Sequence, residues 1–264
     1  MKTTTGRRDV VRFVVNADDL GLNSEINHAI LSAFEDGVIT SATIMANGPA
    51  FAEAVAGVKR FPNASVGVHL NLTACAPMTR AAALGPLLGP DGAFAEDAVY
   101  TVRWTPPLLA AVAEEWTAQV QSVRRAGVDV THLDSHHHVH TLPALFYALK
   151  AVQWRHGIRR VRGTWSIYDR SSAPSPLLVW KKRLWLAAVR CVLPTRTADE
   201  FSDFLMFLRA HEEGSYRPRS WPRVVELMVH PSSDAVSAVE AATLRGGWTE
   251  RLSCHAALAS YANL

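Results

Sequence analysis

The sequence predicts an α/β fold in which mostly parallel strands are covered by helices. Three observations lead to this prediction. Short apolar, β-branched runs alternate with amphipathic segments, Gly or Pro marks most of the boundaries, and no internal repeat interrupts the alternation. Such alternation is typical of βα units, whose strands lie parallel in one sheet. Both an open doubly wound sheet and a closed barrel fit the pattern.

The first half of the chain contains three expected strands and two expected helices. The strands are short runs of apolar and β-branched residues at 11–15, 38–45 and 65–72. Asn23 or Ser24 can cap a first helix that ends at Gly37, and Pro49 opens a second helix that reaches residue 60. Residues 74–105 are rich in Gly, Pro and Ala, so we expect an irregular segment there.

The second half continues the alternation. Further strands are expected at 128–139, 158–164 and 224–229. A long helix should begin after Thr105 and end before Gly127, and another should run from Pro143 to His156 with Gly157 at its end. Together these elements predict one domain that spans residues 1–264.

Composition places the chain among ordinary globular enzymes. Hydrophobic residues make up 48% and charged residues 19%, and 264 residues are enough for a sizeable core. The net charge of +3, without a basic stripe, argues against nucleic acid as a partner. The odd, widely spaced Cys75, Cys191 and Cys254 predict neither a disulfide framework nor a Cys-based zinc site. Residues 1–9 lack the apolar core of a signal peptide, so we expect a cytoplasmic enzyme.

Residues 175–193 are strongly apolar but contain four cations, Lys181, Lys182, Arg183 and Arg190. This charge disfavours a membrane span. One interpretation is a helix packed on the sheet with a basic outer edge. The other is a surface that contacts lipid through Trp180 and Trp185.

Polar side chains stand where several expected strands end. Asp18 and Asp19 follow the first strand, His69 lies near the end of the third, a histidine run ends the fourth, and His230 follows the last. The carboxyl ends of parallel strands form the active face in barrels and in open sheets alike. The sequence therefore predicts a shared site built from Asp and His.

Two adjacent carboxylates at a strand end point in opposite directions if the backbone stays extended, so Asp18 and Asp19 can take different roles. Taken alone, such a pair more often caps the following helix. The strand-end histidines favour the functional interpretation instead. His69 alone would fit a core position equally well, and Asn71, with the same parity, could orient a ligand or bind substrate.

Residues 132–140 contain five of the eleven histidines in the chain. Strand alternation predicts that Asp134, His136, His138 and His140 share one face, while His137 points away. One face could then supply a metal ligand, a supporting carboxylate and a polar pocket wall. The spacing leaves open which histidine binds metal, and an adventitious surface patch is the alternative.

These motifs resemble those of the YdjC-like carbohydrate deacetylases, which include chitooligosaccharide deacetylases and hopanoid-associated deacetylases. The matching segments are Asn16–Gly21, Gly37–Ser41, Gly67–Leu72, Thr131–His140 and Met228–Pro231. The family's usual Phe after the Asp pair is Leu20 here. Residues 74–104 and 175–193 match no part of the family pattern, which leaves the substrate open.

The resemblance implies a distorted, TIM-barrel-like (β/α) barrel that holds one divalent metal ion. The implied ligands are Asp19, His69 and His136. Asp18 would be the general base and His230 the proton donor. Asp134 and His138 would line or support the site, with His140 in its wall by alternation.

The implied reaction is hydrolysis of an N-acetyl group on an amino sugar, free or carried on an oligosaccharide or glycolipid. Nitrogen ligands favour Zn²⁺, while the resemblance leaves Mg²⁺ open. The alternatives are a metallohydrolase of an ester or phosphoester, and a non-catalytic carbohydrate-binding relative. Few carboxylates accompany the histidines, which argues against a two-metal phosphoesterase. The oligomeric state is left open.

Overall fold

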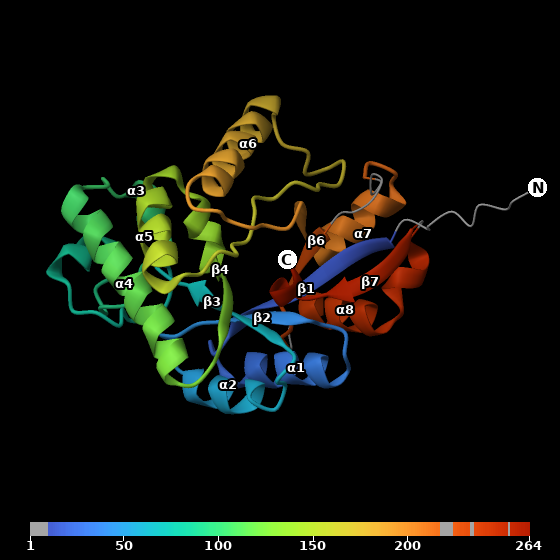
Figure 1. The fold of residues 1–264 in the computed structure, drawn as a ribbon, viewed down its shortest axis with the longest axis horizontal. Helices are drawn as coiled ribbons and strands as arrows, with labels where there is room; N and C mark the ends of the chain where they lie inside the picture. The colour runs from blue at the N-terminus through green and yellow to red at the C-terminus, as the bar shows by residue number, and fades with distance from the viewer. Residues whose placement is uncertain (1–9, 217–223, 233–234, 253) are drawn as a thin grey trace, which may run out of the picture.

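The computed structural model describes residues 10–216, 224–232, 235–252 and 254–264. Its seven strands form one sheet in which every pairing is parallel (Figure 1). The strands are β1 Val10–Leu20, β2 Ser41–Ile44, β3 Ser65–Leu70, β4 Val130–Ser135, β5 Glu200–Asp203, β6 Val224–Val229 and β7 His255–Ala259. The predicted fold class is confirmed.

The sheet curls into a half-barrel with the order β4-β3-β2-β1-β6-β5. The long strand β1 lies at its centre, and β7 pairs with the first half of β1 while β2 pairs with the second half. Between the edge strands β4 and β5, residues 159–167 form single bridges. Val161 pairs with Leu133 of β4, and Ser166 donates its backbone N–H to Phe201 of β5. The expected strand at 158–164 is therefore an irregular spacer between the two edges.

Helices surround the half-barrel (Figure 1). The α-helices are α1 Ser24–Glu35, α2 Phe51–Val58, α3 Ala98–Thr101, α4 Pro106–Arg125, α5 Phe146–His156, α6 Pro176–Cys191, α7 Phe204–Glu212 and α8 Ala235–Arg245. Short 3-10 helices are η1 Ala82–Leu87, η2 His136–Thr141, η3 Pro143–Leu145, η4 Trp248–Arg251 and η5 Tyr261–Asn263. The expected boundary signals are in place. Asn23 caps α1 through its side chain, Thr105 caps α4, and Gly157 ends α5 in a left-handed conformation.

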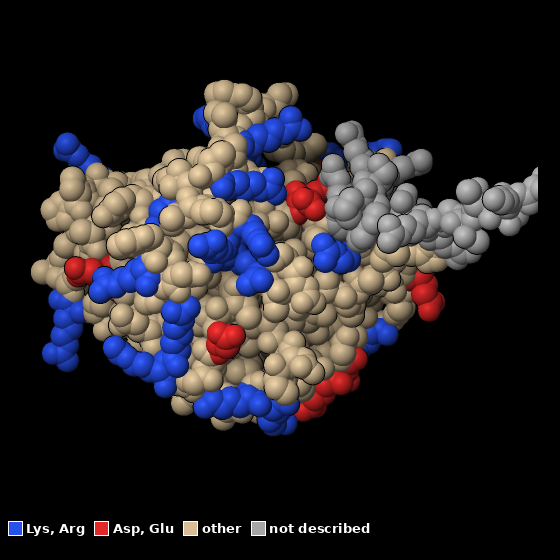
Figure 2. All heavy atoms as spheres, in the orientation of Figure 1, with Lys and Arg blue, Asp and Glu red and all other residues tan. Residues whose placement is uncertain are grey.

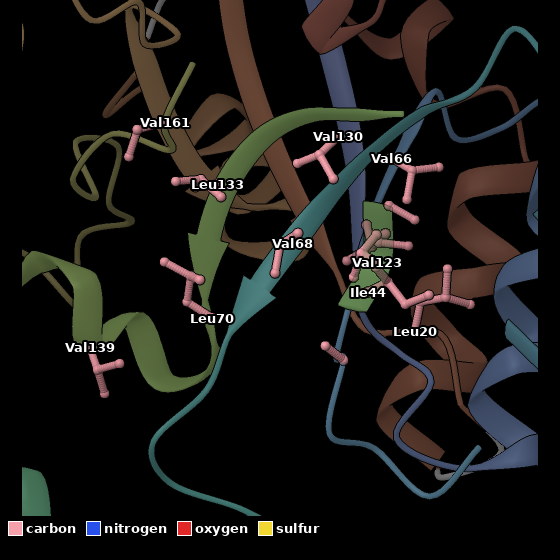
Figure 3. Packing of buried hydrophobic residues seen from close by; sticks show 14 of the residues in the cluster. Leu20, Ile44, Val66, Val68, Leu70, Val123, Val130, Leu133, Val139 and Val161 are labelled. Atoms are coloured by element: carbon pink, nitrogen blue, oxygen red, sulfur yellow. The ribbon is translucent and has the colours of Figure 1, made fainter. Parts of the chain in front are cut away.

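The core fills the space between the sheet and the helices. Strands β2, β3 and β6 are buried at every position, and their buried polar side chains include Thr43, His69 and Glu226. Figure 3 shows Val68 and Leu70 of β3 beside Leu133 of β4, with Val123 of α4 in the same cluster. This packing holds the strands in register, so that their carboxyl ends lie along one edge of the sheet.

Several expectations need correction or stay untested. The fourth strand ends at Ser135, several residues before the expected end at 139. Residues 74–105 are largely irregular, as expected, with only η1 and α3 inside them. The expectation about residues 1–9 lies outside the described residues, and the single-domain expectation stays a prediction. Among the helices that the structure describes, none is both long and apolar enough to cross a bilayer.

Candidate active site

The two adjacent carboxylates at the end of β1 face the same site. The register of β1 against β2 shifts between Ala17 and Leu20, and Asp19 has a left-handed backbone with φ of 67°. An extended backbone would send Asp18 and Asp19 to opposite faces, as the sequence predicted, so that prediction is wrong. The bulge turns the Asp19 side chain toward the histidines, and non-glycine residues with such strain cluster at functional sites.

His69 lies between two carboxylates. Its Nδ1 is 2.7 Å from Oδ1 of Asp134 and its Nε2 is 3.1 Å from Oδ1 of Asp19. Thr43 donates its hydroxyl to Oδ2 of Asp134 at 2.9 Å, which holds that carboxylate in place. A histidine whose Nδ1–H is bound by a carboxylate presents Nε2 as a metal ligand, the arrangement typical of carboxylate–histidine–metal sites.

His136 approaches the same oxygen from the other side. Its Nε2 lies 3.7 Å from Oδ1 of Asp19, and its Nδ1 lies 2.8 Å from the hydroxyl of Thr73. Asn71 holds this turn, because its side-chain oxygen accepts from the backbone N–H of Thr73 and of Ala74. Asn71 thus supports the turn that orients His136.

The Asp19 oxygen has the properties expected of a metal ligand. Oδ1 is buried, and neither nearby imidazole gives it a hydrogen bond of acceptable geometry. Such a buried oxygen is costly unless another partner satisfies it. Asp19, His69 and His136 therefore fit a divalent cation, with further coordination positions open for water and substrate.

A second possible cluster shares His69. Asp18, His69 and Asp134 have ligand atoms within 4.8 Å of one another, and this buried group could also hold a metal ion. Its carboxylates already have partners, however, since both oxygens of Asp18 accept from Arg162 and both oxygens of Asp134 accept hydrogen bonds. Asp19 is the carboxylate with a free lone pair, so we favour the set of Asp19, His69 and His136.

The fully buried Arg162 connects three carboxylates. Its two terminal nitrogens donate to Asp18 at 2.6 and 2.7 Å, and one of them also lies 2.9 Å from Oδ2 of Asp134. Its Nε donates to Glu226 at 2.6 Å, and Glu226 in turn accepts from the hydroxyl of Tyr261. This cation neutralises the charge of the site's inner wall and fixes the plane of the Asp18 carboxylate.

Both carboxyl groups of the Asp pair are acidified. Burial opposes the ionisation of Asp18, but the Arg162 guanidinium outweighs it and holds the pKa of Asp18 well below its usual range. Burial also opposes the ionisation of Asp19, but His69 and then His136 outweigh it and lower the pKa of Asp19. Both side chains are therefore anionic at neutral pH.

The histidines differ from one another. Burial opposes the protonation of His69, but Asp134 and then Asp19 outweigh it and raise the pKa of His69 to about 10. Burial and the charge of His69 lower the pKa of His136 to about 4. Burial, with the charge of Arg162, lowers the pKa of His138 to about 3.

His230 lies at the outer edge of the site, after β6. Its Nε2 is 4.0 Å from Oδ2 of Asp18, and 46% of its side chain is exposed. Its backbone N–H donates to Glu240 at 2.7 Å, which fixes the strand end. The imidazole can thus meet a substrate that enters from solvent.

The histidine run does not alternate as a strand would. After Ser135 the chain forms η2, and His137 and His138 both have left-handed backbones. His140 is fully buried behind the site, where its ring contacts the Ser135 hydroxyl at 2.5 Å and the Arg162 carbonyl at 3.3 Å. The prediction that Asp134, His136, His138 and His140 share one face is therefore wrong beyond Ser135, where the strand ends. His140 does not line the site, because it is fully buried behind it. His137 packs its ring against that of His136, with centroids 3.9 Å apart, and its Nδ1 lies 3.9 Å from Glu96, so the expectation that it points away stays a prediction.

His138 connects the site to a neighbouring cavity of about 340 Å³. Its ring packs edge-on against Trp165 and Phe201, and its Nδ1 is buried without a hydrogen bond. Leu178 and Trp185 of α6 form another part of the cavity wall. The cavity wall is largely apolar and aromatic, and Lys181 and Lys182 also contribute to it.

Sequence reasoning missed Arg162, Thr43 and Thr73. Arg162 is one of three arginines in residues 158–164, and the sequence carries no signal that separates it from Arg159 and Arg160. Thr43 and Thr73 carry no distinctive signal, because their importance depends on the histidines and carboxylates that other elements bring to them.

Fold and site together define a parallel α/β half-barrel. At the carboxyl ends of its strands lies a cluster of Asp and His that could hold a metal ion. The description "YdjC-like protein" belongs to the family model that matches residues 12–260. The chain therefore belongs to the YdjC-like family, which confirms the resemblance seen in its motifs.

Relatives with assigned names support this membership. A carbohydrate deacetylase of Halalkalibacterium halodurans is 36% identical over 149 residues, which cover 56% of this chain and 62% of that protein. A carbohydrate deacetylase of Geobacillus stearothermophilus is 38% identical over 153 residues, covering 56% and 59%. The alignments thus span about three fifths of these relatives' own length.

A solved structure shares the whole fold. It is a protein of Enterococcus faecalis, named for a suggested role in cellobiose-phosphate cleavage. The TM-score is 0.74 at 23% identity, and the match covers 96% of this chain and 98% of that one. At this level of identity the likeness establishes the fold alone.

Proposed function

We propose that this protein is a metal-dependent hydrolase that removes the N-acetyl group from an amino sugar. The observation that carries the proposal is the buried Asp19 oxygen, which faces two imidazole nitrogens at 3.1 and 3.7 Å beside a second carboxylate, Asp18. Relatives that align over half of the chain bear the name carbohydrate deacetylase, and this supports an acetylated sugar as substrate.

Asp19, His69 and His136 would hold one divalent ion. Such an ion acidifies a water molecule and polarises the acetyl carbonyl when it is bound. Asp134 accepts the Nδ1–H of His69 and so directs its Nε2 toward Asp19, and Thr73 holds the ring of His136 by a hydrogen bond at Nδ1. The contacts of Asp134 and Thr73 therefore hold both rings in the orientation that a bound ion would need.

Asp18 acts as the general base. Its carboxylate is ionised because of Arg162, and it can take the proton of the attacking water while Arg162 and Asn16 hold its orientation. Asn16 donates its amide to Oδ1 of Asp18 at 2.9 Å. A base with a fixed plane needs little reorganisation during the reaction.

His230 donates a proton to the departing amine. An amine is a poor leaving group unless it is protonated as the carbon–nitrogen bond breaks. His230 approaches Asp18 from the solvent side, so the base and the acid flank one reacting centre. Both groups then act on the same acetamide.

The cavity beside His138 receives the part of the sugar beyond the acetamide. Trp165 and Phe201 offer flat apolar surfaces, and the Nδ1 of His138 offers one hydrogen-bonding atom. Pockets of this size suit small ligands, and aromatic rings pack well on the apolar faces of sugars. A substrate can therefore extend from the Asp pair toward α6.

The test is release of acetate from a panel of N-acetylated mono-, di- and oligosaccharides and glycolipids, with and without a chelator. We expect release that stops when the metal is removed and returns when it is restored. O-acetyl esters and phosphoesters belong in the same panel. If an O-acetyl ester or a phosphoester is hydrolysed faster than every amide, hydrolysis of that class replaces the proposed reaction.

Two variants separate the roles in the site. Asp18→Asn should keep the metal and lose turnover, and unchanged activity would remove Asp18 as the base. His136→Gln should lower metal content, whereas a site made of Asp18, His69 and Asp134 would not respond. His28→Gln on α1 is the matched control, because the His28 side chain is 80% exposed and lies beside Glu53 of α2 instead of the proposed ligands.

A further inference from the structure

Helix α6 has an apolar stripe on the side that faces away from the protein. Trp185 and Val189 are buried on the packed side. On the other side, Leu177, Trp180 and Leu184 are 60%, 57% and 50% exposed. Positions three and four apart share a helix face, so these three residues form one stripe, which Ala188 and Cys191 continue. A helix packed on its own protein needs only one apolar face, so the outer stripe requires another explanation.

Cations border this stripe on both sides. Helical geometry at about 100° per residue places Arg183 with Arg190 along one edge and Lys181 along the other, where Lys181 is exposed and also borders the cavity beside His138. Residues 170–198 contain no Asp or Glu at all. An apolar stripe with Trp and Leu between rows of Lys and Arg is typical of helices that lie in the surface of a bilayer.

The surrounding surface has the same sign of charge. Figure 2 shows Lys and Arg gathering on and below α6, which stands at the top of the molecule, with few Asp and Glu among them. Arg190 of α6 also lines a cavity of about 500 Å³. Four further arginines line the same cavity: Arg124, Arg159, Arg160 and Arg196. The partner of this face should therefore carry negative charge.

We propose that α6 docks on a bilayer that contains anionic lipid, with Leu177, Trp180 and Leu184 inserted and the flanking cations on the headgroups. A second copy of this chain is a poorer partner, because two such stripes in contact would bring Lys181 and Arg183 against their own equivalents with no carboxylate between them. The lipid hypothesis from the sequence is thereby refined. Trp180 faces outward, whereas Trp185 is buried and lines the inner cavity.

Docking has a consequence for the site, since the inner side of α6 forms a wall of the cavity beside His138. The same helix would thus hold that cavity near the lipid surface. The proposal itself rests on exposure and charge, and it does not depend on the deacetylase reaction.

The test is co-sedimentation of the full chain with phosphatidylcholine vesicles, with and without phosphatidylglycerol. We expect binding only when the anionic lipid is present, and a decrease as salt is raised. Trp180→Glu and Leu184→Glu should each lower the partition coefficient by about tenfold or more, because each replaces inserted apolar area with a charge. Lys181→Gln and Arg183→Gln should each lower it by about fivefold.

Two controls lie next to each other on α5. Trp154 is 76% exposed and Arg155 is also exposed, so Trp154→Glu and Arg155→Gln make the same chemical changes outside the stripe. Both should bind vesicles like the unchanged protein, and thermal melting should confirm that every variant is folded. Absence of binding to anionic vesicles, or equal losses in the α5 variants, would overturn the proposal. A dimer that Trp180→Glu dissociates, without vesicle binding, would assign the stripe to a second copy instead.

Discussion

Arg162 holds the carboxylate of Asp18 through two parallel hydrogen bonds, at 2.6 and 2.7 Å, and neither residue is more than 1% exposed. Paired, bidentate geometry of this kind fixes the plane of a carboxylate as well as its charge. Because Arg162 also contacts Asp134, one buried cation positions both the proposed base and the carboxylate behind His69. Arg162 is thus a positioning residue for the whole site.

Arg162→Lys should therefore impair activity more than stability. Lysine keeps the positive charge but cannot form the two parallel bonds, so Asp18 loses its fixed plane. We expect kcat/KM to fall by about 100-fold. The weaker contact should also raise the pKa of Asp18, which acts in its ionised form. Any part of the acidic limb of the kcat/KM profile that reports the ionisation of Asp18 should therefore move to higher pH.

The measurement is the pH profile of acetate release. Arg160→Lys is the matched control, because Arg160 is two residues away and donates to the backbone oxygens of Ala262 and Leu264 instead of the site. A kcat/KM in Arg162→Lys equal to that in Arg160→Lys would show that Arg162 does not position Asp18.

Much of the site could be predicted because strand ends are readable in a sequence. Buried parallel strands are apolar runs, so polar residues directly after them mark the active edge. Asp18, Asp19 and His69 were placed at that edge by this argument, and the structure brings them together.

The remainder depended on features that local patterns do not encode. The left-handed backbones at His137 and His138 end the alternation. Such backbones are uncommon for any residue other than glycine, so a run of histidines does not by itself signal them. Arg162 is important because of Asp18, which lies 144 positions away in the chain, and no spacing rule connects the two residues. Closure of the half-barrel by single bridges at Val161 likewise follows from tertiary contacts.

Asp134→Asn should weaken metal binding. The substitution removes the carboxylate that accepts the Nδ1–H of His69, so the ring loses its fixed tautomer and some of its basicity. Loss of such a supporting carboxylate typically costs about 10–100-fold in metal affinity. Competition with a chromophoric chelator measures the change directly.

Asp129→Asn provides the comparison for this variant, because Asp129 is an exposed carboxylate just before β4. Its metal affinity should equal that of the unchanged protein. Equal affinity in Asp134→Asn as well would exclude His69 as an oriented ligand, provided that thermal melting shows a folded chain.

Metal binding should release about one proton near neutral pH. In the metal-free site the pKa of His69 is raised to about 10, so its ring is protonated, whereas the pKa of His136 is lowered to about 4 and its ring is neutral. The pKa of Asp19 is lowered, so this ligand carries no proton either. A metal at Nε2 must displace the His69 proton.

Calorimetric titration in buffers with different ionisation enthalpies counts this proton. The sign follows from the raised pKa. Below about pH 10 the apparent affinity should rise by up to about tenfold per pH unit, and it should level off above that pH. If no proton is released, His69 does not lose its proton when the ion binds. That result would exclude His69 from the ligand set.

His230→Ala should discriminate between leaving groups. His230 is the exposed imidazole that faces Asp18 at 4.0 Å, and its proposed role is to protonate the departing nitrogen. An amide needs this proton, but an activated ester has a leaving group that departs as a stable anion. We expect a loss of about 10²–10⁴-fold in kcat for N-acetyl substrates and a much smaller loss for an activated acetyl ester. Metal content should stay the same in the variant, since His230 is not among the proposed ligands. Equal losses on amide and ester would mean that His230 binds substrate or maintains the edge of β6, and the proton would then have to come from another group.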